Sequence, residues 1–197
     1  MPLNPITQQP VVDPQKVEHI STRPQKRIEI VEPSPTWPAT YEHIAQRIRS
    51  AIGNYMISIE HIGSTSVPGL PAKDIIDVDV IVPDPSAEDS YIPALEAAGF
   101  QFLLREPDWY QHRFLGLEFP YANVHVFGPD GHEAIRHRLF RDWLRDHEED
   151  RIRYAAAKRE AAEASRNAGE TVMQYTDRKE PVIRDILQKI YKVHGML

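Results

Sequence analysis

Apolar and polar positions follow two different periods along this chain. Over residues 37–52 apolar side chains recur every three or four positions, which predicts an amphipathic helix ending at Gly53, a residue suited to a left-handed cap. Alternation then predicts a strand over 57–62. A loop of small residues over 63–71 follows, and a dense apolar run over 75–82 predicts a second strand. The expected order is therefore helix, strand, loop, strand.

The rest of the chain separates strands from helices. Ser86 is placed to cap a helix that runs through Ala98 and stops at Gly99. Further short strands are expected over 100–104, 112–115 and 122–127. Beyond His132 the strand pattern disappears, and helical stripes take over in segments around 135–143, 151–168 and 183–190. Strands first and helices afterwards indicate an α+β fold, with a mixed sheet backed by helices and a helical C-terminal half.

One domain is expected within the 197 residues. Residues 1–27 show neither period, and eight of the 17 prolines fall before position 40, so this segment is predicted to be a disordered, proline-rich arm. Residues 28–197 then form a single domain, with the sheet core reaching to about residue 131 and the helical part over 132–197. Whether Pro181 kinks one terminal helix or starts a new one stays open, because helical spacing lies on both sides of it.

Composition excludes several classes of function. The chain contains no cysteine, which excludes disulfides, thiolate zinc sites and cysteine nucleophiles. It has no apolar run long enough to cross a membrane, so a soluble, cytoplasmic protein is expected. Residues 1–131 hold 9 Lys and Arg against 17 Asp and Glu, whereas residues 132–197 hold 14 against 12. Neither a membrane nor sequence-specific DNA is an expected partner of such an acidic chain.

Two acids stand out in the strand predicted over 75–82. Asp77 and Asp79 are two positions apart, so both carboxylates project to one face while their apolar neighbours pack on the other. Like charges this close need a cation between them, and Mg²⁺ or Mn²⁺ prefers such oxygen ligands. Gly63 and Ser64 would let the backbone and a hydroxyl approach a phosphate chain on the same ion. The plainer alternatives are a solvated edge strand and an ordinary turn.

A longer signature surrounds these acids. Residues 61–82 read H-I-G-S-T-S-V-P-G-L-P-A-K-D-I-I-D-V-D-V-I-V, and N-V-H-V follows at 123–126. The segment F-R-D-W-L-R stands at 140–145, and Tyr-Lys pairs one helical turn apart stand at Tyr154/Lys158 and Tyr175/Lys179. This pattern, spanning about residues 37–191, resembles the GrpB family, also called UPF0157, a branch of the nucleotidyltransferase superfamily.

The resemblance implies a nucleotidyltransferase-like sheet with a known arrangement of site residues. Asp77 and Asp79 would be the metal-binding acids, and the phosphate-binding loop would consist of Gly63, Ser64, Thr65 and Ser66. One departure matters. Superfamily members that transfer nucleotides use a third carboxylate from a later strand, whereas the strand here carries Asn123 and His125. Ordinary nucleotidyl transfer with two metal ions is therefore not favoured.

Other candidates have two interpretations each. His125 is a proton carrier, a weak metal ligand or a structural residue, and His61 is expected to fix the loop. Lys73 pairs with a phosphate or with Asp74. Each lysine of a Tyr-Lys pair contacts a phosphate beside a stacked base, or simply lies under its tyrosine. The anion-binding wall is expected to comprise Arg113, Arg141, Arg145, Lys158 and Lys179, and further substrate-binding candidates are Asn123, Tyr154 and Tyr175.

The favoured function is a transferase acting on a tRNA- or nucleotide-borne substrate. The chain resembles fungal arginine-containing cyclodipeptide synthases, which implies aminoacyl-tRNA as partner and cyclo-Arg-Xaa as product, with no required cofactor. In that hypothesis Asp77 and Asp79 grip a guanidinium group and His125 is the base. The alternatives are an Mg²⁺- or Mn²⁺-dependent nucleotidyltransferase using ATP or another triphosphate, and a non-catalytic nucleotide-binding protein.

Overall fold

The computed structural model describes residues 4–8 and 13–197. The strands are β1 Glu18–His19, β2 Ser58–Ile62, β3 Ile76–Ile81, β4 Gln101–Glu106, β5 His112–Leu117 and β6 Ala122–Phe127. The α-helices are α1 Trp37–Ile52, α2 Ile92–Ala97, α3 His132–Asp146, α4 Glu148–Ala168 and α5 Val172–Val193. Within the described residues, none of the helices combines the length and apolar character needed to span a bilayer.

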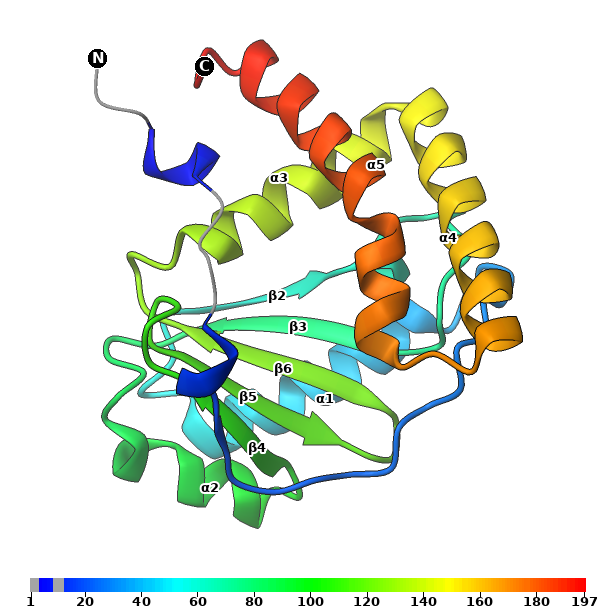
Figure 1. The fold of residues 1–197 in the computed structure, drawn as a ribbon. Coiled ribbons are helices and arrows are strands. Elements are labelled where there is room, and N and C mark those ends of the chain that lie inside the picture. The colour runs from blue at the N-terminus through cyan, green and yellow to red at the C-terminus, as the bar shows by residue number, and fades with distance from the viewer. Residues whose placement is uncertain (1–3, 9–12) are drawn as a thin grey trace.

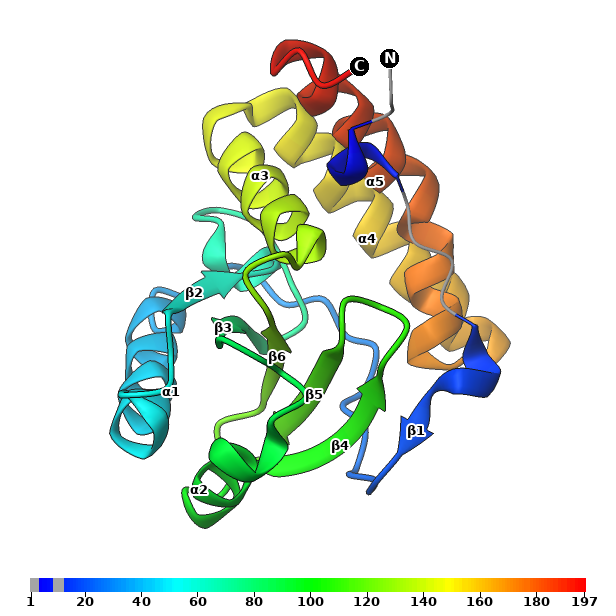
Figure 2. The same ribbon diagram turned by 90° about the vertical axis from the view of Figure 1, so that its left-hand side faces the viewer.

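The strands form one six-stranded sheet in the order β1-β4-β5-β6-β3-β2. Its pairs are antiparallel except β3 and β6, which run parallel, so the sheet is mixed. Helices α1 and α2 cover one face, and α3, α4 and α5 lie across the other (Figures 1 and 2). The predicted α+β fold with a helical C-terminal half is therefore confirmed.

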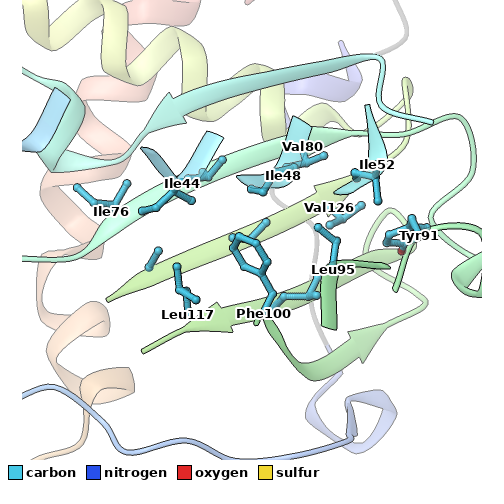
Figure 3. Close-up of a cluster of buried hydrophobic side chains, with 14 of the residues drawn as sticks. Ile44, Ile48, Ile52, Ile76, Val80, Tyr91, Leu95, Phe100, Leu117 and Val126 are labelled. Atoms are coloured by element: carbon cyan, nitrogen blue, oxygen red, sulfur yellow. The ribbon is translucent and has the colours of Figure 1, made fainter. Parts of the chain in front are cut away.

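The main apolar core lies between the sheet and α1 and α2. Ile76, Val78 and Val80 alternate along β3 and pack with Ile44 and Ile48 of α1. Figure 3 shows Ile44 and Ile48 close to Ile76 and Val80. Burying one such side chain contributes roughly 1.5–3 kcal/mol. Because this set occupies one face of β3, the intervening polar residues of the strand project to the face that carries α3 and α5.

Two predicted helix ends differ from the structure. Gly53 has a φ of −51°, in the right-handed region, because the chain continues into a further turn in which the amide of Tyr55 bonds the carbonyl of Ile52 at 2.8 Å. The helix expected from Ser86 is shorter, since α2 begins only at Ile92. Tyr91 separates α2 from the preceding 3₁₀ turn, because its φ of −147° lies outside the helical region, and Pro93 lies in the first turn of α2, where its missing amide hydrogen is tolerated.

The C-terminal helix settles the question about Pro181. Helix α5 is a single helix with Pro181 inside it. It begins with a capping box in which the Thr171 hydroxyl accepts from the Gln174 amide and the Gln174 side chain accepts from the Thr171 amide.

The N-terminal arm lies against the domain over the part that is described. β1 pairs with β4, and Arg23 donates to the carbonyls of Leu117 at 3.1 Å and Ala122 at 2.7 Å. Arg23 also donates to Oδ1 of Asn123. Residues 13–27 thus differ from the predicted disordered arm, because backbone pairing and an arginine, rather than an apolar stripe, hold them. Residues 1–3 and 9–12 lie outside the described residues.

A Gly116→Ala substitution tests whether the hydrogen bonds of Arg23 hold the N-terminal arm on the domain. A Cβ at Gly116 would lie 2.5–2.7 Å from atoms of the Arg23 guanidinium group, so this group must shift away from the carbonyls that accept its hydrogen bonds. Losing hydrogen bonds from a charged group costs about 2 kcal/mol, which increases the detached fraction of the arm roughly thirtyfold. Trypsin cleavage after Lys16 should accelerate accordingly, and Gln25→Ala, a change of an exposed arm residue, should leave it unchanged. Equal rates of cleavage in Gly116→Ala and wild type would contradict this role of Arg23.

Candidate functional site

The loop after β2 lies directly over β3. Gly63 has a φ of +70°, and a Cβ there would lie 2.9 Å from the Cβ of Asp77, so glycine is needed for this approach. His61 Nε2 bonds Thr65 Oγ1 at 3.0 Å, and Thr65 Oγ1 donates to the carbonyl of Ile75 at 3.1 Å. The Ser66 hydroxyl donates to the carbonyl of Gly63 at 2.5 Å. The Thr65 and Ser66 hydroxyls therefore hold the loop, as does His61, whereas Ser64 lines the cavities described below.

Asp77 and Asp79 share the predicted face of β3 but have separate partners. Asn123 Nδ2 donates to Asp77 Oδ1 at 2.6 Å, across the parallel pair of β3 and β6. Asp79 is 3% exposed and its Oδ2 lies 2.9 Å from Nδ1 of His137 in α3. Burial raises the pKa of Asp77. Burial opposes charge on His137 as well, yet the Asp79 carboxylate outweighs it and raises the pKa of His137 to about 9.

This arrangement does not fit a divalent ion between the two acids. The carboxylate of Asp79 is neutralised by the imidazolium of His137, and Asp77 faces the amide nitrogen of Asn123. Across residues 4–8 and 13–197, no three His, Asp or Glu side chains converge as a possible metal-ligand set. With Asp79 paired in this way, Asp77 and Asp79 do not form a joint clamp for a guanidinium group in this structure. The sequence does not indicate His137 as a site residue, because its contact with β3 depends on how α3 crosses the sheet.

Three amines gather around Asp77 in a small cavity of about 190 Å³. Lys73, Lys158 and Lys179, named here the lysine cluster, line it together with Ser64, Asn123 and Asp77. Lys158 Nζ donates to the carbonyl of Pro71. The cluster therefore unites a loop before β3 with helices α4 and α5.

The amines of the lysine cluster lie close to two tyrosine rings. The Lys179 ammonium lies 4.3 Å and the Lys73 ammonium 5.2 Å from the ring centroid of Tyr175. The Lys158 ammonium lies 4.9 Å from that of Tyr154, whose hydroxyl bonds Ser64. Both tyrosines are buried, and Tyr175 is only 1% exposed. Each lysine of a Tyr-Lys pair therefore has its ammonium over the ring of its own tyrosine.

The electrostatics of the lysine cluster favour an anion. Burial lowers the pKa of Lys73 and, with help from Lys73, lowers that of Lys179 to about 8. Burial and the neighbouring Lys179 hold the pKa of Lys158 well below its usual range. Among the described residues that line this cavity, Asp77 is the one carboxylate against three amines. An anion bound there would relieve both the desolvation and the mutual repulsion of the amines.

A larger cavity of about 400 Å³ adjoins the lysine cluster and shares Gly63, Ser64, Asp77, Tyr154 and Lys179 with it. The other polar residues that line it include His125, His137 and Arg141. Its apolar side is formed by the loop after β2 and by α3 and α5, and includes Val67, Phe140, Leu144, Ile183 and Leu187. The two cavities together provide a cationic end and a mainly apolar end, which suits a ligand with a phosphate attached to a larger body.

Of the other predicted site residues, some line the larger cavity and others have structural contacts outside it. Arg141 lines the larger cavity and bonds Glu60 at 2.8 Å. Arg145 donates to the carbonyl of Ser66 at 2.8 Å, so it braces the loop. Arg113 is not part of the wall, because it is buried and bonds Glu88 at 2.6 Å.

Lys73 does not pair with Asp74, which instead accepts from Lys26 and from the Trp37 indole, each at 2.9 Å. His125 does reach the larger cavity. Its Nδ1 lies 3.0 Å from Nε2 of His112, a residue the sequence analysis did not single out.

Comparisons with known proteins agree with the predicted family. A family model described as GrpB protein matches residues 27–189. The chain belongs to the GrpB family. It is 41% identical over 162 residues to a UPF0157 protein of Halalkalibacterium halodurans, covering 82% of both chains, and 40% identical over 147 residues to one of Streptomyces coelicolor, covering 75% of both. The crystal structure of GrpB from Enterococcus faecalis matches with a TM-score of 0.71 and 27% identity, covering 85% of this chain and 99% of that one.

Some relatives carry the name of an activity. This GrpB protein is 30% identical over 203 residues to a dephospho-CoA kinase of Mycolicibacterium paratuberculosis, covering 88% of this chain and 49% of the kinase. The match thus spans about half of that protein. The GrpB and UPF0157 membership is confirmed by these comparisons, while the nucleotidyltransferase relationship and cyclic dipeptide synthesis stay predictions.

A titration of Lys179 checks the electrostatics of the lysine cluster. NMR of ¹³C-labelled lysine should place its midpoint near 8. Because the folded pKa lies below the ordinary value, the unfolded chain binds the extra proton between pH 8 and 10.5, so the contribution of Lys179 to the free energy of unfolding rises with pH across that window.

Asp77→Asn should move this midpoint further down, because the Asp77 carboxylate raises the pKa of Lys179. Asp185→Asn, which removes an exposed acid of α5 paired with Arg153, is the matched control and should leave the midpoint in place. A wild-type midpoint in the ordinary lysine range would contradict the proposed crowding of amines.

Proposed function

We propose that this GrpB protein is a transferase that binds a phosphate of a tRNA- or nucleotide-borne substrate in the lysine cluster and acts without a divalent ion. The observation that carries the proposal is the excess of amines in the small cavity, where the buried Lys158 and the half-buried Lys73 and Lys179 stand against the carboxylate of Asp77 among the described lining residues. Buried charge requires partners, and three amines exceed what one carboxylate neutralises. A phosphate group supplies the missing negative charge and several acceptor oxygens.

The shape of the two cavities supports a phosphate at one end and chemistry at the other. Ser64 and Asp77 line both cavities, so a phosphate among the lysines would lie beside the larger space. His125 lines that larger space and is the candidate base for an attacking group. Burial holds the pKa of His125 well below its usual range, so its imidazole is neutral and able to accept a proton.

Aminoacyl-tRNA is the favoured substrate within this proposal. The α-amine of one aminoacyl group would attack the ester carbonyl of a second, forming an amide as the ester to the tRNA ribose breaks. The amine loses a proton to His125, and the departing ribose hydroxyl gains one. A second such step closes the cyclic dipeptide and releases the other tRNA. Neither step needs a metal, in keeping with the separate partners of Asp77 and Asp79. Arginine specificity rests on the family resemblance alone.

Nucleotidyl transfer is the second candidate. It is favoured by the close approach of the Gly63 backbone to Asp77, an acid on the face of β3 that also carries Asp79. It would require the Asp79–His137 ion pair to open before a divalent ion binds. Phosphoryl transfer like that named in the dephospho-CoA kinase has less support, because this chain lacks the G-x-x-x-x-G-K-[ST] motif of P-loop kinases.

An assay for product distinguishes these functions. Purified, pre-charged tRNAs with chelator, and labelled triphosphates with Mg²⁺, are each incubated with the protein and analysed by mass spectrometry. A diketopiperazine that forms in chelator is expected, and His125→Ala should reduce its rate by roughly 10² to 10⁴. Nucleotidylated product that requires Mg²⁺ would overturn the metal-free proposal. Ligand binding without product from either source would contradict a transferase and favour a nucleotide-binding protein.

Binding of pyrophosphate tests the lysine cluster directly. Lys73→Met and Lys179→Met each remove one charge and should weaken binding, measured by calorimetry, by roughly 10- to 100-fold, since a charged hydrogen bond contributes about 1.5–3 kcal/mol. Lys192→Met, at the exposed end of α5, is the matched control and should bind as wild type does. Unchanged affinity in both cluster variants would place the anion elsewhere.

A further inference from the structure

A second polar chain runs behind the larger cavity, away from the lysine cluster. Glu106 at the end of β4 and His112 at the start of β5 are direct cross-strand partners, and Glu106 Oε2 lies 2.6 Å from Nδ1 of His112. On its other side, Nε2 of His112 lies 3.0 Å from Nδ1 of His125 in β6. A carboxylate and two imidazoles are thus connected across three adjacent strands, and the last of them lines the cavity.

Aromatic side chains insulate the middle of this chain. His112 is 2% exposed, and its ring lies 4.7 Å between centroids from Phe127, in a stacked arrangement. The Trp109 ring meets it edge-on at 4.8 Å. The Glu106 side chain, in contrast, is 15% exposed. Water therefore reaches the Glu106 end of the chain. The hydrogen bond between the two histidines, in contrast, has little competition from solvent.

The hydrogen bonds determine the tautomers. With Glu106 ionised, His112 donates from Nδ1 to the carboxylate and accepts at Nε2, so His125 carries its hydrogen on Nδ1. Nε2 of His125 is then unprotonated and available to the cavity. When Nε2 gains a proton, shifting one proton along each bond leaves Glu106 neutral and reverses all the donors. The two states differ only in proton positions, and no ring has to turn.

We propose that Glu106, His112 and His125 form a proton relay, in which His125 takes a proton from the attacking group in the cavity and the proton leaves through His112 to Glu106. The proposal rests on the proposed function, because it assumes a substrate group that loses a proton. His125 is the catalytic residue, and Glu106 and His112 are positioning residues that also carry the proton.

The surroundings explain why the proton moves on rather than staying on His125. The protonated His137 of the Asp79 pair lies 5.7 Å away between ring centroids, and a second cation there is unfavourable. Arg23 on the N-terminal arm and Arg113 beside His112 add positive charge, against which Asp79 is the opposing acid. Burial raises the pKa of Glu106, and the nearby His19 of β1 opposes this increase. A neutral Glu106 is therefore a suitable end point for the proton.

Two substitutions of Glu106 separate a relay from a static orienting role. Glu106→Gln keeps an oxygen that accepts from His112 but is unable to take the proton, whereas Glu106→Leu removes both functions. Histidine ¹⁵N NMR should show Nδ1-protonated His125 in wild type and Glu106→Gln, and a mixture of tautomers in Glu106→Leu. The rate of product formation should fall roughly 10²-fold or more in both variants. Asp108→Asn, which removes an exposed carboxylate two residues away, is the matched control.

The readouts also separate failure of the relay from failure of the proposed function. Pyrophosphate affinity should be unchanged in both Glu106 variants, because Glu106 lies outside the lysine cluster. Wild-type rates in Glu106→Gln would overturn the relay while leaving the transferase in place. Should no substrate give product, the NMR comparison still decides, because a His125 tautomer that does not respond to Glu106→Leu overturns the proposed chain.

Discussion

The site depends on one close contact, that of Gly63 with Asp77. The backbone of the loop comes so near to β3 that a side chain at position 63 would collide with the aspartate. The carboxylate is thereby shut between the loop and the sheet, with only Asn123 as a direct partner among the hydrogen bonds described. A buried carboxylate is a strong attractor for amines. Lys73, Lys158 and Lys179 gather around it from three separate parts of the chain.

Local periodicity was sufficient to predict much of this fold. Alternation along β3 correctly placed Asp77 and Asp79 on the face opposite Val78, because the period of a strand is a property of the strand itself. The period of a strand does not predict which side chains of other elements contact it. That Asp79 meets His137 depends on how α3 crosses the sheet, and a period in one segment contains no such information.

Arg113 shows how a single position decides the role of a residue. It lies opposite Val126 in the pairing of β5 with β6, on the side of the sheet that holds the core, whereas the next residue, Phe114, lies opposite His125. An arginine one position later would face the site. Its strand was predicted, but the side of the sheet depends on register, which a residue-type argument for an anion-binding wall ignores. His112 was missed for a related reason, since only the alignment of β4, β5 and β6 connects it with Glu106 and His125.

The lysine cluster has a consequence for how the two layers of the molecule hold together. Lys158 and Lys179 belong to the α4–α5 hairpin, while Asp77 belongs to β3 and Lys73 to the loop before it, so the three amines meet at the boundary between the two layers. Without an anion their repulsion weakens the docking of the hairpin on the sheet. A bound anion would contact amines of both layers at once. Such a ligand would therefore also stabilise the packing of the hairpin on the sheet.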